Sequence, residues 1–235
     1  NGADLDPDVL YAQVTGVPTD VSKAEDVEAL AARALDAYGA VHLVVNNAGV
    51  SPLGNVWENT VADWQWILGV NLWGVIYGGK VFTPIMLAQD TESHIVNVGS
   101  VSGLLPSYPS APYHVTKHAV TALTENLYFS LAQQESKVKV SLLCPGWVKT
   151  SILKSERNRP PELQTSTGAS SLSPADKAAY QRMKESIEAG MSIQELADHV
   201  FRAIQEEQFY VLTHPEYIPK IQKRVDNIVQ QKNPL

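Results

Sequence analysis

Ser100, Tyr113 and Lys117 have side chains and spacings that together suit acid–base chemistry at an oxygen atom. Tyr113 and Lys117 are four residues apart, which places them on one face of a helix, one turn from each other. A free tyrosine has a pKa of about 10, and a nearby ammonium group lowers that pKa by stabilising the phenolate. The hydroxyl of Ser100, brought alongside, would bind the same substrate oxygen. These residues therefore predict proton transfer to or from an alcohol or carbonyl oxygen.

The pair Tyr113 and Lys117 would be weak evidence alone, because Tyr-x-x-x-Lys is common on helices without a catalytic role. The elements that must position the pair carry more information. Buried apolar segments alternate with stretches of helical periodicity, which is typical of a parallel sheet with helices on both faces. The expected strands are residues 14–17, 41–45, 94–98, 138–143 and 209–212, and the expected helices are residues 23–38, 60–87, 113–134, 175–189, 192–206 and 218–231.

Ligands of such a sheet bind beyond the carboxyl ends of its strands. Asp20, Asn47, Ser100 and Pro145 each lie just after an expected strand, so all of them are expected at one edge of the sheet. We expect a single domain over residues 1–235. Residues 149–174 are rich in Pro, Ser and Thr and lack periodicity, which favours a substrate lid within residues 149–190.

Composition excludes several classes of function. The net charge of −7 argues against non-specific binding to nucleic acid or to anionic membranes, so neither partner is expected. There is no apolar run of bilayer-spanning length and no recognisable signal peptide. Cys144 is the one cysteine, which rules out an internal disulfide, and the six histidines have no metal-ligand spacing. These features predict a cytoplasmic enzyme without a metal.

Six motifs occur together along the chain. They are Asp20-Val21, Asn46-Asn47-Ala48-Gly49, Asn71, Ser100, Tyr113-x-x-x-Lys117 and Pro145-Gly146-x-Val148-x-Thr150. With these motifs, in this order, the chain resembles the short-chain dehydrogenase/reductase family, and the resemblance covers nearly the whole chain. It implies a Rossmann-like α/β fold and an NAD(P)-dependent oxidoreductase that interconverts a secondary alcohol and a ketone.

The resemblance also implies a role for each matching residue. Tyr113 would be the general acid or base, and Lys117 would lower its pKa and hold the nicotinamide ribose. Ser100 would orient the substrate oxygen, and Asn71 would complete a proton relay by binding a water near Lys117. The cofactor, NAD or NADP, would be bound by Asp20, Val21, Asn47, Ala48, Gly49, Tyr113, Lys117, Pro145, Gly146, Val148 and Thr150.

Each of these residues also has a purely structural explanation. Asp20 would cap a helix, Asn47 would close a turn, Pro145-Gly146 would end a strand, and Asn71 would be a buried polar group satisfied by backbone. Taken singly these explanations are favoured, and the joint occurrence of the motifs reverses that judgement.

An apolar substrate pocket is expected beside the catalytic residues. For each of its candidate residues, core packing is an equally good explanation. The family resemblance further implies a homodimer or homotetramer, since its members pair through two long helices. The candidate substrate residues are Ser102, Leu104, Tyr108, Trp147 and Ile152.

The first strands of the usual family fold, with their glycine-rich turn, are not recognisable in the sequence. That turn presents backbone N–H groups to the cofactor's pyrophosphate. We therefore expect residues 1–235 by themselves to bind NAD(P) weakly or not at all, and a central strand to form an exposed edge. A second hypothesis follows, in which the chain is a truncated, catalytically inactive family member that acts as an oligomeric binding or scaffold protein.

Overall fold

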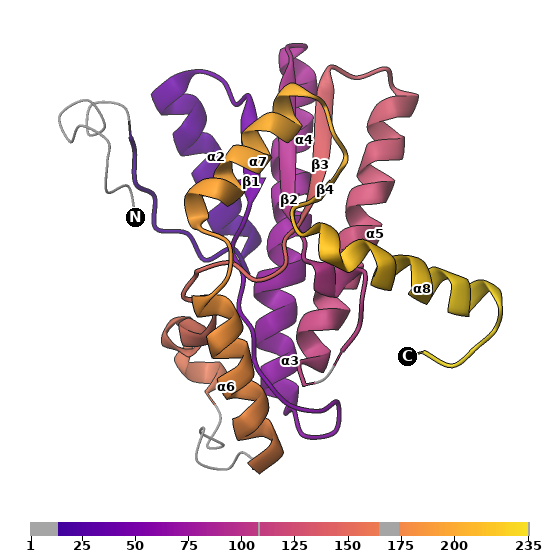
Figure 1. Ribbon diagram of the computed structural model, residues 1–235. Coiled ribbons are helices and arrows are strands. Elements are labelled where there is room, and N and C mark those ends of the chain that lie inside the picture. Colours follow the sequence, from indigo (N-terminus) through magenta and orange to yellow (C-terminus); the bar gives the residue numbers. More distant parts are fainter. Residues whose placement is uncertain (1–13, 108, 165–173, 235) are drawn as a thin grey trace.

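The computed structural model describes residues 14–107, 109–164 and 174–234, and its centre is a parallel sheet (Figure 1). Four strands lie in the order β1-β2-β3-β4, and every neighbouring pair is parallel. The expected Rossmann-like parallel sheet is therefore confirmed for the described residues. The strands are β1 (Leu43–Asn46), β2 (Ser93–Val98), β3 (Val138–Cys144) and β4 (Tyr210–Leu212).

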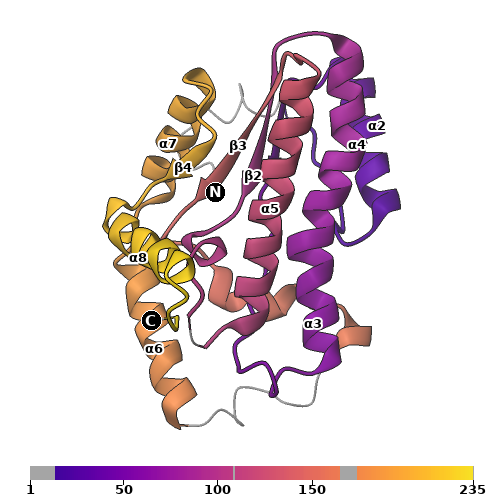
Figure 2. The same cartoon turned by 90° about the vertical axis from the view of Figure 1, so that its right-hand side faces the viewer.

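Helices cover both faces of this sheet, as expected (Figure 2). One face is covered by α2 (Ala24–Tyr38), α4 (Gly74–Gln89) and α5 (Ala111–Gln133), and α7 (Ile193–Gln205) lies on the other. Side chains of a strand alternate between faces. Leu142 accordingly packs with the α4 and α5 side, whereas the next residue, Leu143, packs with Ala203 of α7.

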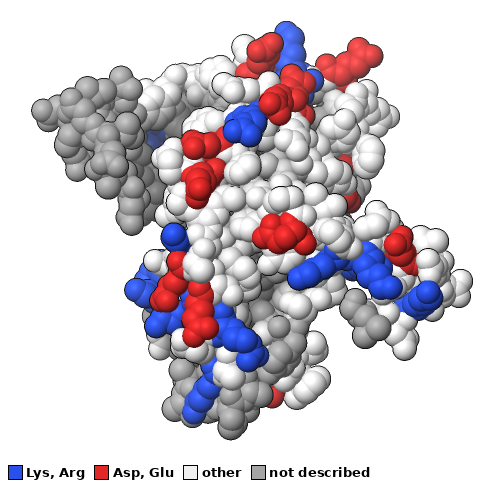
Figure 3. All heavy atoms as spheres, viewed as in Figure 1, with Lys and Arg blue, Asp and Glu red and all other residues white. Residues whose placement is uncertain are grey.

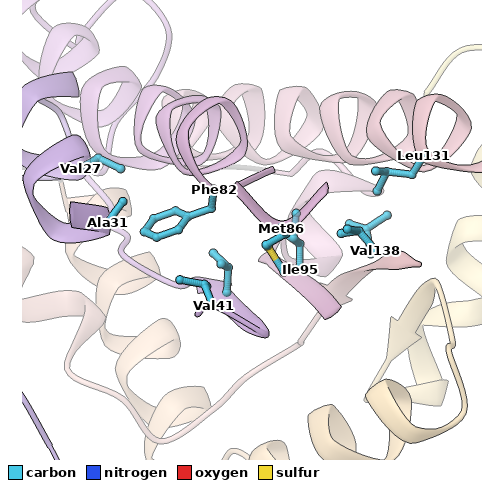
Figure 4. Packing of buried hydrophobic residues seen from close by; sticks show 10 residues of the cluster. Val27, Ala31, Val41, Phe82, Met86, Ile95, Leu131 and Val138 are labelled. Atoms are coloured by element: carbon cyan, nitrogen blue, oxygen red, sulfur yellow. The ribbon is translucent and has the colours of Figure 1, made fainter. Parts of the chain in front are cut away.

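The main hydrophobic core lies between the sheet and the helices of the first face (Figure 4). Val27 and Ala31 of α2 approach Phe82 of α4, and Met86 lies over Ile95 of β2. Met86 is fully buried and Ile95 is nearly so. Burying such side chains contributes about 1.5–3 kcal/mol each, so this layer anchors the strands that carry the functional loops.

A long helical segment leads from β1 to β2. It consists of α3 (Val61–Ile67), a π-helical turn over Leu68–Trp73, and α4. Thr60 and Asp63 form a capping box at its start. Asn71 lies in the π-helical turn, and single π turns are frequent at functional sites.

The remaining elements are short or lie toward the carboxyl end of the chain. They include α6 (Pro174–Glu188) and α8 (Ile218–Val229). Short 3-10 turns lie in the segments between the longer elements. The turns are Val101–Gly103, Ile152–Asn158, Pro161–Leu163 and Pro215–Tyr217.

The strand expected at residues 14–17 is wrong, because this segment has no regular structure. Apolar character there does not lead to burial, since Val14 is 62% exposed. Within the described residues β1 lies at one edge of the sheet, with Leu43 and Val45 nearly half exposed. The absence of further strands beyond this edge stays a prediction.

Candidate active site

Ser100 lies just beyond the carboxyl end of β2 and is brought to Tyr113, as the spacing predicted. The Ser100 hydroxyl lies close enough to the Tyr113 phenol to lower the pKa of that group. The Ser100 Oγ also accepts a hydrogen bond from the Ser102 N–H at 3.0 Å and lies 3.4 Å from the Pro145 carbonyl. These contacts fix a buried hydroxyl beside the phenol, so both can bind one substrate oxygen.

The phenol of Tyr113, in the first turn of α5, is held in its protonated form. Burial raises the pKa of Tyr113 above its ordinary value of 10.0, and the hydrogen bond with Ser100 lowers it by a smaller amount. In the chain by itself, the net pKa of Tyr113 is therefore raised by burial and not lowered as expected. A protonated phenol at neutral pH is suited to donate a proton to a carbonyl oxygen.

Lys117 lies one turn further along α5 and is buried, with only 4% of its surface exposed. Its Nζ donates to the Val98 carbonyl at 2.7 Å and lies 5.5 Å from the centre of the Tyr113 ring. Burial lowers the pKa of Lys117 to about 8. An ammonium group has three N–H donors. Among the described residues Val98 takes one of them, so the others are available to ribose hydroxyls.

Asn71 is fully buried, and its side chain holds the loop that follows β1. The Asn71 Oδ1 accepts from the Val50 N–H at 2.8 Å, and its Nδ2 donates to the Val50 carbonyl at 2.9 Å and to Thr116 Oγ1 at 3.3 Å. Two of these three hydrogen bonds go to the backbone, as expected if Asn71 is a buried polar group with a structural role. Because Thr116 precedes Lys117, Asn71 still links the β1 loop to the catalytic helix.

A hollow of about 340 Å³ opens along β1, between α2 and α4. Val21, Asn47 and Ala48 line it near the carboxyl end of β1, so three predicted cofactor residues share one site. The rest of its lining is mainly apolar, which suits an aromatic base better than a phosphate. Asp20 lies beside Val21. Burial raises the pKa of Asp20, but hydrogen bonds from Ser22 and the Lys23 charge lower it below its ordinary value.

The loop after β3 is fixed by the chain that follows β4. The Gly146 N–H donates to His214 Nδ1 at 3.1 Å, and His214 Nε2 lies 3.1 Å from the Trp147 carbonyl. Val148 is buried and forms a bridge with Met191. His214 was missed as a site residue. None of the six motifs found in the sequence includes it.

Gly49 and Thr150 were also predicted to bind the cofactor, and neither is tightly packed. Gly49 lies close enough to Asn71 that an added Cβ would be 3.7 Å from its Oδ1. Thr150 is exposed at the end of the β3 loop.

The predicted substrate residues do not form one group. Leu104 packs against the buried cluster around Leu142, so core packing explains it. Trp147 is 36% exposed, and Ile152 is half-buried in the 3-10 turn that follows. Ser102 supports Ser100 through its backbone N–H. Tyr108 lies outside the described residues.

A buried ion pair between Arg159 and Asp63 lies near this site and was not foreseen. Thr60 and Asp63 have the spacing of a capping box, which a reading of the sequence can find. No sequence signal joins either of them to Arg159, because the pair is 96 residues apart.

Replacing Gly103 by Ala is expected to separate Ser100 from Tyr113. An added Cβ would lie 2.6 Å from the Lys117 carbonyl oxygen and 2.8 Å from Thr121 Oγ1. The turn must therefore move away from α5, at a cost of about 1–3 kcal/mol in unfolding free energy. Turnover and thermal unfolding would measure both effects. Gly79→Ala is the control, because an added Cβ there meets nothing within 4 Å; equal losses in both variants would contradict this account.

The described residues contain no group of three or more His, Cys, Asp or Glu side chains able to hold a metal ion. Within the same residues, no helix combines the length and the apolar character needed to cross a membrane.

Comparison with known proteins gives concordant matches. A sequence model of the short chain dehydrogenase family matches residues 7–161. The CLA biosynthesis dehydrogenase/reductase of Lactiplantibacillus plantarum is 35% identical over 95% of this chain and 78% of its own length. The putative oxidoreductase SadH of Mycobacterium tuberculosis is 37% identical, over 62% of this chain and 52% of its own length. The chain thus spans between half and four fifths of these relatives.

Solved structures agree with these sequence matches. A short chain dehydrogenase/reductase from Burkholderia phymatum, solved in complex with NAD, has 42% identity and a TM-score of 0.92, covering 97% of this chain and 82% of its own. A putative short-chain dehydrogenase from Novosphingobium aromaticivorans has 26% identity and a TM-score of 0.73, covering 97% and 73%.

Proposed function

Because this chain belongs to the short-chain dehydrogenase family, we propose that it is an NAD(P)-dependent oxidoreductase that interconverts a secondary alcohol and a ketone. The observation that carries the proposal is the buried Ser100 hydroxyl near the Tyr113 phenol, with the buried Lys117 ammonium beside the phenol ring. Acid–base chemistry at a substrate oxygen needs these groups in contact, and they come from two different elements.

In the reducing direction, the carbonyl oxygen of the ketone accepts hydrogen bonds from Ser100 and Tyr113. A bound dinucleotide in its reduced form would supply the hydride that the carbonyl carbon receives. Tyr113 gives its hydroxyl proton to the oxygen as the C–O π bond breaks, so the product is a neutral alcohol. Lys117 stabilises the resulting phenolate, which then regains its proton from solvent; a water near Lys117, held through Asn71, would complete this relay.

We also propose a binding site for the cofactor from the predicted residues. Lys117 would hold the nicotinamide ribose, and Val21, Asn47 and Ala48 would face the adenine side through the hollow along β1. The structure solved with NAD supports a dinucleotide of this class. The choice between NAD and NADP stays open in the proposal, and Asp20, Gly49 and the loop of Pro145, Gly146, Val148 and Thr150 are proposed as further contacts.

A small apolar substrate is proposed, bound beside Tyr113 by residues of the 149–190 region. Acidic and basic side chains are interspersed over most of the face in Figure 3. The basic residues of α8 are Lys220, Lys223 and Arg224. Together with a net charge of −7, this favours a small molecule over nucleic acid. Val115 and Tyr128 of α5 are nearly half exposed and Phe129 is largely exposed, which supports a homodimer or homotetramer. A single domain and a cytoplasmic location stay predictions.

A turnover assay tests the proposal. The 235-residue chain would be given a panel of ketones and secondary alcohols with NADH, NADPH or their oxidised forms, and the absorbance of the reduced nicotinamide followed. Calorimetry with NADH and NADPH would measure cofactor affinity separately. Turnover of at least one substrate supports the proposal. A folded oligomer that binds ligands without any turnover would favour the scaffold alternative.

A further inference from the structure

The segment after the Pro145 loop has little local structure to hold it in place. It contains two short 3-10 turns, Ile152–Asn158 and Pro161–Leu163, with non-helical backbone at Lys154. Turns of this kind have poor hydrogen-bond geometry and are seldom stable alone. The position of residues 152–163 must therefore depend on contacts with other elements.

Arg159 supplies the strongest of these contacts. Its side chain is only 4% exposed, and its Nη2 donates to Asp63 Oδ1 at 2.6 Å. Its Nε donates to the Leu163 carbonyl at 2.7 Å, and its guanidinium lies 4.9 Å from the centre of a Trp66 ring. Planar guanidinium groups suit combined pairing and stacking of this kind. One side chain thus joins the segment to α3.

The partner carboxylate is itself held in place. Asp63 Oδ2 accepts hydrogen bonds from the backbone and the hydroxyl of Thr60, at 2.7 and 2.8 Å. Burial raises the pKa of Asp63, but the hydrogen bonds from Thr60 and Arg159 outweigh burial and lower it below its ordinary value. Asp63 is therefore ionised at neutral pH, and the Arg159 charge has a fixed counter-charge at the start of α3.

The anchored segment reaches the catalytic tyrosine. Leu163 and Tyr113 both pack against one buried cluster, formed by Val50, Trp66 and Ile67. Arg159 binds the Leu163 carbonyl and stacks on Trp66, so it fixes the apolar surface on which the phenol ring also rests. Arg159 makes no described contact with Ser100 or Lys117.

We propose that Arg159 is a positioning residue for the substrate, which holds residues 152–163 against α3 so that they form the wall of the substrate site beside Tyr113. A second contact supports this arrangement, because the Ser51 N–H donates to the buried Ser155 Oγ at 3.2 Å. The inference that an apolar ketone or alcohol binds there rests on the proposed function. The anchoring of residues 152–163 by Arg159 does not depend on that function.

The test compares Arg159→Leu and the double variant Asp63→Asn/Arg159→Leu with the wild type. The double variant leaves no unpaired buried charge, so it keeps the comparison valid if the single variant folds poorly. We expect KM for the ketone to rise about tenfold or more, with kcat within about threefold, because substrate positioning is lost while the proton donor stays in place. Affinity for the dinucleotide should not change.

Arg33→Leu is the matched control. Arg33 lies on α2, outside the proposed wall of the substrate site, and forms an exposed ion pair with Asp36 of the same helix. It should leave KM unchanged. Hydrogen exchange gives a second measurement that needs no turnover: amides of residues 151–164 should exchange faster in the Arg159 variants and at the wild-type rate in Arg33→Leu.

The outcomes separate the two proposals. A folded double variant with unchanged KM, or with unchanged exchange in residues 151–164, would overturn the role of Arg159. A loss of kcat at constant KM would overturn it too, because that pattern points to the chemistry. If the wild type turns over no substrate, the proposed function fails, and the exchange measurement still decides whether Arg159 holds the segment.

Discussion

Tyr113→Phe is expected to lower kcat for ketone reduction about 10²–10⁴-fold, the usual contribution of a positioned general acid. The substitution removes one hydroxyl and keeps the ring that packs beside Val50, Trp66 and Ile67. Ser100 keeps its hydrogen bond from the Ser102 N–H. The loss should therefore appear in kcat, with little change in cofactor affinity. Steady-state kinetics and calorimetry with NADH would measure the two quantities.

The stability of the variant is an internal control for this prediction. The Tyr113 hydroxyl is held protonated by burial, so its removal takes away no buried charge. The unfolding free energy should change by only about 1 kcal/mol, the net value of one hydrogen bond. Full activity in a folded Tyr113→Phe protein would refute the proposed mechanism, and activity lost through unfolding would show up in thermal denaturation.

Sequence reasoning found the residues of the site better than it found their surroundings. Ser100, Tyr113 and Lys117 were predictable because a strand end and a helical spacing of four residues fix them locally. Alternation of apolar segments also predicted the parallel sheet. The strand at residues 14–17 was predicted wrongly, because apolar residues form a strand only where a neighbour pairs with them, and pairing is not a local property.

The contacts that were missed depend on tertiary structure. Arg159 lies in a segment without periodicity, and only the fold brings it to Asp63. Leu104 was as good a candidate for a pocket as for the core, and only the structure shows that it packs against the cluster around Leu142. The direction of the Tyr113 pKa was also misjudged, since the effect of burial cannot be read from a spacing.

Lys117→Met is expected to abolish activity and yet stabilise the protein near neutral pH. Burial lowers the pKa of Lys117 from 10.5 to about 8, which means that the folded state disfavours the charged ammonium. The difference between these two pKa values corresponds to a free-energy penalty of roughly 3 kcal/mol for the charged form in the folded state. Loss of the hydrogen bond to the Val98 carbonyl offsets about 1 kcal/mol of that gain. A rise of roughly 1–3 kcal/mol in unfolding free energy should follow at pH 6–7.

The pH dependence of this gain in unfolding free energy shows whether removal of the buried Lys117 charge causes it. Below pH 8 the folded and unfolded chains both carry the proton on Lys117, so the full penalty of burying the charge applies. Between pH 8 and 10.5 the folded protein loses this proton before the unfolded chain does, so the stability of the wild type rises. The advantage of Lys117→Met should accordingly shrink across this range and reach its minimum above it.

Urea unfolding of both proteins at several pH values between 6 and 11 would measure this trend. Lys80→Met is the control, because it removes an exposed lysine of α4 instead of a buried one. A stabilisation by Lys117→Met that stays constant across the range would point to better packing of the Met side chain. A destabilisation at pH 6 would mean that the ammonium is held by stronger interactions than the contact with Val98. The expected pattern would show that the fold tolerates an unfavourable buried charge at the position where the proposed reaction needs one.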